Sequence, residues 1–451
     1  MKKIFLIVFF LLLNAVASMG QGTLWEMPNL TSDTTIVRYW NDGKYFVYTA
    51  TQAGSRTIEL HDNASGSTTS SSLPSNVNIN DFRIAHDSVF ACGFLVNSGE
   101  KHGLLACFSI GDFVSGSFYC NYMVFSTPFT PYGGYNSPVV EVKRLALFDD
   151  GVSTRMAFIA NHYITYPITA EYYRSGYGDA AFRSTGWDVC EYYINKDGTE
   201  VFTDICASDT KIVVAGPSCD SSLLKFQVFD KMRNFAALYG LSHSTHYGFT
   251  DHRILGKVMG TNLTGEMISL AYHYSDGTHG GLSVKVIECG TTPPSLLNSM
   301  EIAEDTATNT TWNMNDIRYD LPTDKLLVLN RIHDPTAGLG SHLFQFSNPV
   351  IALGMCQVEA FPYSKEFQAL DIYSSYKFVI SGMNASGNPN FFIHAIGTPS
   401  NCCAEGTALC PPTAPELNAY TYTHHVAVVL SYNYNSYIAS TYSETINPIC
   451  N

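Results

Sequence analysis

The chain has 451 residues, enough for one very large domain or two ordinary ones, and carries 39 Asp and Glu against 25 Lys and Arg. This acidic balance argues against nucleic-acid binding, which needs a basic surface to neutralise phosphates. Aromatic residues make up 13% of the chain and charged residues only 14%, a composition typical of strand-rich proteins.

The N-terminal segment 1–20 is interpreted as a signal peptide. Lys2 and Lys3 precede an apolar run at 4–13, and small residues follow it. The run is too short to span a bilayer, and no later segment is long and apolar enough to do so. We therefore expect an exported protein with no membrane span, located in the periplasm, at the cell surface or outside the cell.

One pattern recurs along the rest of the chain. An acidic or polar residue opens an alternating strand, and a turn leads to a second, more apolar strand. Third strands follow nearly every copy. The copies lie at 35–50, 81–94, 142–161, 204–217, 251–272, 316–330 and 371–382.

The repeats predict an all-β fold. Second strands such as 211–216 are apolar throughout, so both faces of each sheet must be covered by neighbours. We expect a single β-propeller over residues 21–400, with seven four-stranded blades; residues 418–432 are a candidate eighth copy. Strand 23–30 is expected to form the outer strand of the last blade. Tandem β-sandwiches are the alternative fold.

In architecture, the repeats resemble propellers of the kelch and WD-repeat type. The diagnostic residues of those families, a Trp-Asp pair or a Gly-Gly pair in each blade, are missing. The leader and the aromatic-rich blades look like those of exported bacterial proteins with divergent propeller repeats. This resemblance implies an architecture and no particular activity.

Twelve cysteines in an exported chain indicate disulfides. A hairpin with its loop near 96–103 would place Cys92 opposite Cys107, so we expect these two to be bonded. Cys402, Cys403 and Cys410 lie in the Cys-rich C-terminal segment 401–451, which either clips the fold or completes the last blade. Their spacing does not fit a zinc site.

Two clusters could hold a cation. Aspartates open five of the seven copies. Their carboxylates could line one mouth of the propeller, or they could cap backbone N–H groups. Capping is favoured, because a residue that recurs from copy to copy usually serves the repeat. The five aspartates are Asp81, Asp204, Asp251, Asp316 and Asp371. The cluster His243, His246 and His252 is better explained as a polar loop than as a metal site. No metal and no cofactor is expected.

Segments 118–136 and 162–187 are dense in Tyr, Gly and Pro and are interpreted as long loops. Aromatic rings on such loops make platforms for sugars or protein side chains, and the alternative is that they cover the blade edges. The expected ligand-binding residues are Tyr172, Tyr173, Arg174, Tyr177, Arg183 and Trp187.

No catalytic motif is found in a suitable context. The sequence therefore favours a non-enzymatic scaffold that binds a protein or a carbohydrate outside the cytoplasm. The alternative is a glycan-active hydrolase or lyase with its site at a mouth of the ring.

Overall fold

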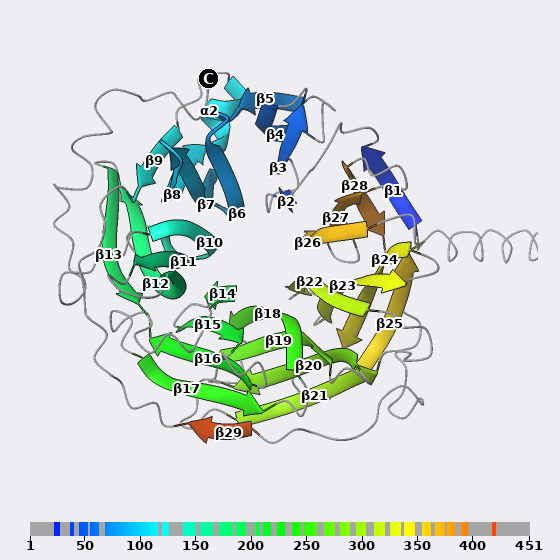
Figure 1. The fold of residues 1–451 in the computed structure, drawn as a ribbon. Helices are drawn as coiled ribbons and strands as arrows, with labels where there is room; N and C mark the ends of the chain where they lie inside the picture. The colour runs from blue at the N-terminus through cyan, green and yellow to red at the C-terminus, as the bar shows by residue number, and fades with distance from the viewer. Residues whose placement is uncertain are drawn as a thin grey trace, which may run out of the picture.

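The computed structural model consists almost wholly of strands, arranged in seven sheets around a common axis (Figure 1). It describes the strands below, together with residues 73–76, 86–87, 98–99, 110–115, Phe125 and Phe202. Within this part of the chain, no helix is long and apolar enough to cross a membrane.

The strands follow the chain sheet by sheet. The first sheet contains β2 (Val37–Tyr39), β3 (Tyr45–Gln52), β4 (Ser55–Asp62) and β5 (Thr68–Ser72), and the second contains β6 (Val77–Ala85), β7 (Ser88–Asn97), β8 (Glu100–Ser109) and β9 (Cys120–Val124), with helix α2 (Ile110–Ser115) between the last two. The third contains β10 (Val139–Asp149), β11 (Thr154–Thr165), β12 (Glu171–Arg183) and β13 (Gly186–Ile194), and the fourth contains β14 (Asp204–Ala207), β15 (Lys211–Pro217), β16 (Leu223–Asp230) and β17 (Ala237–Ser244). The fifth contains β18 (Gly248–Val258), β19 (Glu266–Ser275), β20 (Gly280–Glu288) and β21 (Ser295–Ala303), and the sixth contains β22 (Thr311–Asp320), β23 (Lys325–Asp334), β24 (Gly338–Ser347) and β25 (Gly354–Phe361). The seventh contains β26 (Glu366–Ser374), β27 (Lys377–Met383) and β28 (Pro389–Ala395), joined by the N-terminal strand β1 (Gly22–Met27).

The first strand of each sheet lies innermost. Each innermost strand contacts that of the next sheet, from β2 through β6, β10, β14, β18 and β22 to β26, and β26 contacts β2 again. Sheets packed in pairs, as in tandem sandwiches, would not give this cyclic order. The chain therefore has the architecture of a β-propeller, as the repeats predict.

The N-terminal strand completes the last sheet. β1 runs antiparallel to β28, with Glu26 opposite Phe392 and Met27 opposite Phe391. This confirms the pairing expected for the segment 23–30. The C-terminal segment does not contribute to that sheet in the described residues: its strand β29 (Leu417–Tyr420) pairs with β17 as a fifth strand of the fourth sheet.

Apolar side chains fill the spaces between sheets and cover both faces of the second strands. On β7, Val89 and Ala91 belong to the core shared with the first sheet, whereas Phe90 and Cys92 belong to the core shared with the third. The second strand of the third sheet, β11, contributes in the same alternating way to the cores on its two sides. This two-sided burial explains why the second strands read as continuous apolar runs.

The expected disulfide between Cys92 and Cys107 is wrong. The β7–β8 hairpin closes on a two-residue turn, with Asn97 opposite Glu100, so that Cys92 faces Leu105 and Cys107 faces Phe90. Both cysteines are free and buried. The turn residues Ser98 and Gly99 have φ angles of 53° and 86°, which are the positive values that a tight hairpin turn requires.

Burial in the apolar core raises the pKa of both thiols well above its ordinary value. The thiol pKa is therefore higher in the folded protein than in the unfolded chain. The contribution of the protonated thiols to stability is fully present below the unfolded-state pKa, and it is lost as the pH rises from there through the folded-state pKa. Cys92 and Cys107 are therefore unreactive core residues in the folded protein.

The β1–β28 pairing makes a testable prediction. In an antiparallel ladder, only one of two consecutive residues directs its N–H toward the partner strand. Replacing Glu26 and Met27 by proline, one at a time, should therefore lower the free energy of unfolding in at least one variant by about 1–3 kcal/mol more than alanine at the same site. Chemical denaturation of the four variants measures this, and proline variants as stable as their alanine controls would contradict the closure.

Candidate functional site

Aspartates occupy a recurring position on the innermost strands. Asp81 lies on β6, Asp204 on β14 and Asp316 on β22, each opposite the corresponding residue of the second strand: Cys92, Ala215 and Leu329. All three aspartates are buried. Their repetition was visible in the sequence, and their surroundings explain it.

A β-bulge comes just before this position. The register of β6 with β7 shifts between Ile79 and Asp81, which leaves Asn80 as an extra residue, and the same shift occurs between Met314 and Asp316 on β22. The Asn80 side chain reaches the next sheet, where its Nδ2 donates to the carbonyl oxygen of Val142 and to Oε1 of Glu141, both at 2.9 Å. The bulge thus turns a polar side chain toward the neighbouring inner strand.

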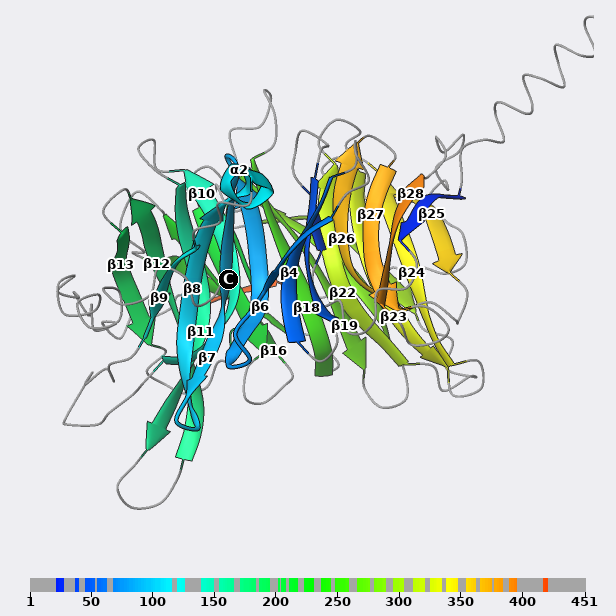
Figure 2. The same ribbon diagram turned by 90° about the horizontal axis from the view of Figure 1, so that it is seen from above.

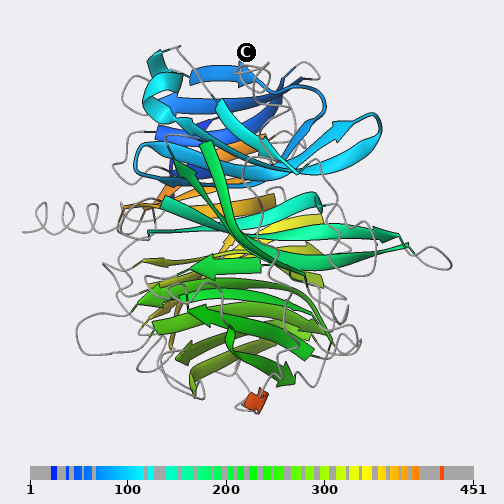
Figure 3. The ribbon, with the colours of Figure 1, turned by 90° about the vertical axis from the view of Figure 1, so that its left-hand side faces the viewer.

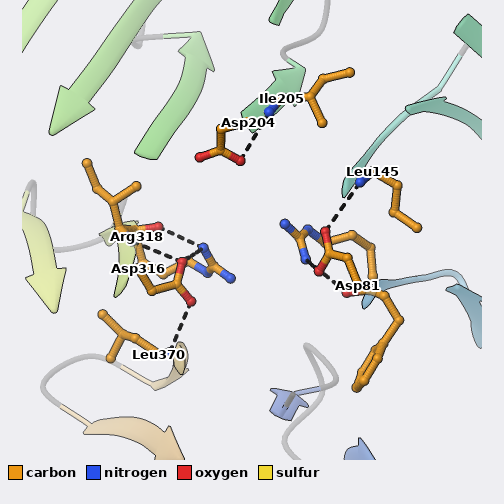
Figure 4. A network of polar contacts seen from close by, with 10 residues as sticks. Asp81, Leu145, Asp204, Ile205, Asp316, Arg318 and Leu370 are labelled. Carbon is orange, nitrogen blue, oxygen red and sulfur yellow. Dashed lines mark hydrogen bonds and ion pairs between the residues drawn. The ribbon is translucent and has the colours of Figure 1, made fainter. Parts of the chain in front are cut away.

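The carboxylates accept hydrogen bonds from backbone N–H groups of their own strand and of the next sheet. Leu145 N on β10 donates to Oδ2 of Asp81 (3.3 Å), and Leu370 N on β26 donates to Oδ2 of Asp316 (3.1 Å). Within their own strands, Ile205 N donates to Asp204 (3.1 Å) and Ile317 N donates to Asp316 (3.0 Å). Near the axis, Asp81 therefore joins the second sheet to the third, and Asp316 joins the sixth sheet to the seventh (Figure 4).

Two of these aspartates also pair with an arginine two residues along the strand. Arg83 Nη1 donates to Oδ1 of Asp81, and Arg318 Nη1 donates to Oδ1 of Asp316 at 2.7 Å. The same Nη1 atoms donate to the carbonyl oxygens of Phe82 (2.9 Å) and Ile317 (2.7 Å). The sequence analysis missed these arginines, although Asn-Asp-x-Arg stands in the printed sequence at 80–83 and again at 315–318.

This arrangement confirms the capping role for Asp81, Asp204 and Asp316, whose carboxylates all accept backbone N–H groups. A ring of carboxylates open to a cation is a poor description of Asp81 and Asp316, since each is already neutralised by a guanidinium group. In the described part of the chain, no group of three or more His, Cys, Asp or Glu side chains could hold a metal ion.

Asp371 does not belong to the set. The bulge of β26 lies between Phe367 and Ala369, so Ala369 takes the position that Asp81 and Asp316 have in their strands. Asp371 lies opposite Val379, the position that the arginines occupy on β6 and β22. Asp251 does follow a bulge, on β18, but its side chain lies outside the described residues.

The histidine cluster is divided between two sheets. His243 lies on β17, the fourth strand of the fourth sheet, and His252 lies on β18, the innermost strand of the fifth. His246 lies outside the described residues.

The expected binding residues lie on strands, which corrects the interpretation of 162–187 as a loop. Tyr172, Tyr173, Arg174, Tyr177 and Arg183 are part of β12, and Trp187 is part of β13 opposite Phe182. Their side chains lie outside the described part of the structure.

The hairpin formed by β11 and β12 extends beyond its own sheet. β10 pairs with β11 only as far as His162, and β13 pairs with β12 only from Gly176 onward. The pairs Tyr163–Tyr173, Ile164–Tyr172 and Thr165–Glu171 continue past both limits. This ribbon, residues 163–165 and 171–173, extends from one end of the ring, as does the β7–β8 hairpin, while α2 lies at the other end (Figures 2 and 3).

No family model matches the chain, and no curated protein matches its sequence. Solved structures are similar at low identity. The WD40 domain of SCAP from fission yeast shares 8% identity with a TM-score of 0.41, covering 83% of this chain and 87% of that one. The polysaccharide lyase Uly1 shares 9% with a TM-score of 0.43, covering 82% and 91%. The propeller domain of the Trilobed protease from Pyrococcus furiosus shares 7% with a TM-score of 0.34, covering 74% and 99%.

The bulge predicts a strict requirement for glycine in β7. A Cβ atom at Gly93 would lie 1.8 Å from the backbone oxygen of Asn78, just before the bulge. Gly93→Ala should therefore destabilise the protein by about 1–3 kcal/mol, because backbone must move to make room. Gly111→Ala on α2 is the matched control, since its nearest neighbour is Ser109 Oγ at 3.6 Å. Equal melting temperatures of the two variants would refute the close approach.

The contacts of Asp81 predict its contribution to stability. Asp81→Ala removes the acceptor for Leu145 N and leaves Arg83 without its carboxylate, so we expect a loss of about 3–5 kcal/mol in the free energy of unfolding. Asp112→Ala, at an exposed position on α2, should change it by less than about 0.5 kcal/mol. Urea denaturation of both variants measures the difference. A loss at Asp81 no larger than at Asp112 would show that the contacts of Asp81 with Leu145 N and Arg83 contribute nothing to stability.

Proposed function

We propose that the chain is an exported, seven-bladed β-propeller, closed by its N-terminal strand, that acts as a non-enzymatic binding scaffold. The observation that carries the proposal is the ribbon of β11 and β12. Propeller sheets cover one another's faces, so partners must bind at the ends or the rim of the ring. The ribbon is a feature at one end that the packing of the sheets does not require.

The ribbon offers backbone groups as well as side chains. Among the strands that the structure describes, residues 163–165 have no neighbour on the β10 side and residues 171–173 have none on the β13 side. A two-stranded ribbon is only marginally stable in water, and its edges present unpaired N–H and C=O groups. An extended segment of another protein can pair with such an edge, and tyrosines at 163, 172 and 173 add contact area.

An extracellular protein is therefore the proposed partner, with a carbohydrate as the alternative occupant. Of the glycan-active enzymes considered from the sequence, a hydrolase needs a pair of carboxylates that can transfer protons. The carboxylates of Asp81 and Asp316 near the axis are instead engaged by guanidinium and backbone N–H groups, which suits them to holding sheets together. Binding is accordingly the function that the site supports best.

A shortened ribbon tests the proposal. Replacing residues 163–173 by Asn-Gly lets His162 and Arg174, which already pair, close a two-residue hairpin. The melting temperature should stay within about 2 °C, because the removed residues pair with no third strand among those described. A photo-crosslinking phenylalanine at position 172 should capture an extracellular protein from intact cells, and the shortened chain, present in excess, should fail to compete.

Two controls make the result specific. The same probe at Val114, which is 42% exposed on α2 at the other end, should capture nothing in common with position 172. Tyr172→Thr with Tyr173→Thr keeps strand propensity and separates side-chain contacts from backbone pairing. Glycan-array binding that depends on the ribbon would identify a carbohydrate ligand instead. Full competition by the shortened chain, or its failure to fold, would rule the ribbon out as the binding surface.

A further inference from the structure

The fourth sheet has a fifth strand on its outer edge. β29 runs antiparallel to β17 and pairs with Gly240–His243. Figure 1 shows it outside β17, at the rim of the ring. Among the strands that the structure describes, each of the other six sheets has four. The fourth sheet is distinguished from them by the sequence of its outer strand.

The outer strands of the other sheets have features that discourage pairing with another chain. An outer strand presents a row of unpaired N–H and C=O groups, and proteins protect such strands by keeping them short or by placing charges on them. β5 and β9 have only five residues each. The longer outer strands β1, β13, β21 and β25 each contain at least one acidic residue: Glu26, Asp188, Glu191, Glu301 and Glu359.

β17 has neither protection. It is eight residues long, and its sequence Ala-Leu-Tyr-Gly-Leu-Ser-His-Ser contains no Lys, Arg, Asp, Glu or Pro. Among the described outer strands it is therefore the one best suited to pair with another extended strand, and it is also the one that the chain covers. On the fourth sheet, β29 thus has the protective role that shortness or charge has on the other sheets.

The covering strand is short and is tethered to a distant sheet. Only four residue pairs join β29 to β17, and β29 pairs with no second strand among those described. β28 ends at Ala395 in the seventh sheet, so residues 396–416 form the connection to β29. A tether of this length gives β29 an effective concentration on the order of 1 mM at its own β17. Another strand can replace β29 when it exceeds that concentration or when the tether is lost.

We propose that the β17 edge is a self-association surface, which binds the β17 edge of a second copy of this chain once β29 has left. Two copies related by a two-fold axis pair antiparallel, and the central residues of β17 then lie close to the same residues of the partner. Like charges brought together in this way destabilise a pairing, and β17 has none, whereas β13, β21 and β25 would bring acidic residues together. This surface is on the fourth sheet and the ribbon is on the third, so either proposal can fail without the other.

Proline substitutions in β29 test the proposal in the full chain. Asn418→Pro with Ala419→Pro removes the N–H groups of two consecutive residues, one of which faces β17 in an antiparallel ladder. At about 0.1 mM protein, tenfold below the effective concentration of the tethered strand, the wild type should sediment as a monomer and the variant with twice that mass. Asn418→Ala is the matched control, because it keeps the backbone donors, and it should remain a monomer.

A charge on β17 shows whether this strand forms the interface. Ser242→Lys, added to the proline variant, should restore the monomer, because pairing of two copies brings the two lysines together. Ser242→Thr in the same background should leave the dimer intact. Hydrogen exchange gives an independent readout: the outward-facing amides within Gly240–His243 should be protected in the wild type and in the dimer, and should exchange about tenfold faster or more in the Ser242→Lys monomer.

Cleavage after folding covers the case in which the proline variants do not fold. A recognition site for a specific protease replaces residues 411–416, and the folded protein is cut under reducing conditions. Loss of the tether should produce the dimer, and a synthetic peptide of residues 415–424 in excess should return it to the monomer by occupying β17. A cut protein or a folded proline variant that stays monomeric at the same concentration, or a dimer that persists with Ser242→Lys, would overturn the proposal.

Discussion

A sheet that is apolar on both faces has to be covered on both faces, and the ring arrangement meets this need. Alternate residues of β7 enter the cores on opposite sides of the second sheet, and β11 does the same in the third. A closed ring gives each sheet two neighbours and leaves no sheet with an uncovered face. The order of the inner strands and the engagement of β1 by the last sheet both follow from that requirement.

Covering the faces brings the innermost strands together, where apolar contact alone would leave backbone groups of adjacent strands unpaired. The buried aspartates meet this need by accepting N–H groups from the next sheet, at Leu145 and Leu370. Their negative charge is then compensated by arginines that stay in contact with solvent. The residues that join the sheets therefore leave the guanidinium, rather than the carboxylate, as the more exposed charge of each pair.

Features that follow from the pattern of apolar and polar residues along a strand could be predicted from the sequence. Features that depend on a single inserted residue, such as a bulge or the length of a turn, could not. Apolar second strands and the pairing of β1 follow from local composition, and both were foreseen. The Cys92–Cys107 pairing failed because Asn97–Glu100 forms a two-residue turn, and a polar run there reads equally well as a longer loop. Asp371 was misplaced because the bulge in β26 shifts the register by one residue, which no composition reveals. The Tyr- and Gly-rich sequence of β12 favours a loop when read alone, because glycine disfavours strands until neighbouring strands fix the backbone.

The joining of β1 to β28 also bears on the order in which the protein is assembled. Residues 22–27 are made several hundred residues before their partners 391–395. Earlier sheets can form from hairpins between successive strands, but among the strand pairs that the structure describes, this one has the longest sequence separation and the largest loop-closure entropy. Until it forms, the strand and the open edge of β28 are both exposed to mispairing with other chains. Ring closure is therefore expected as a late step in folding, sensitive to protein concentration.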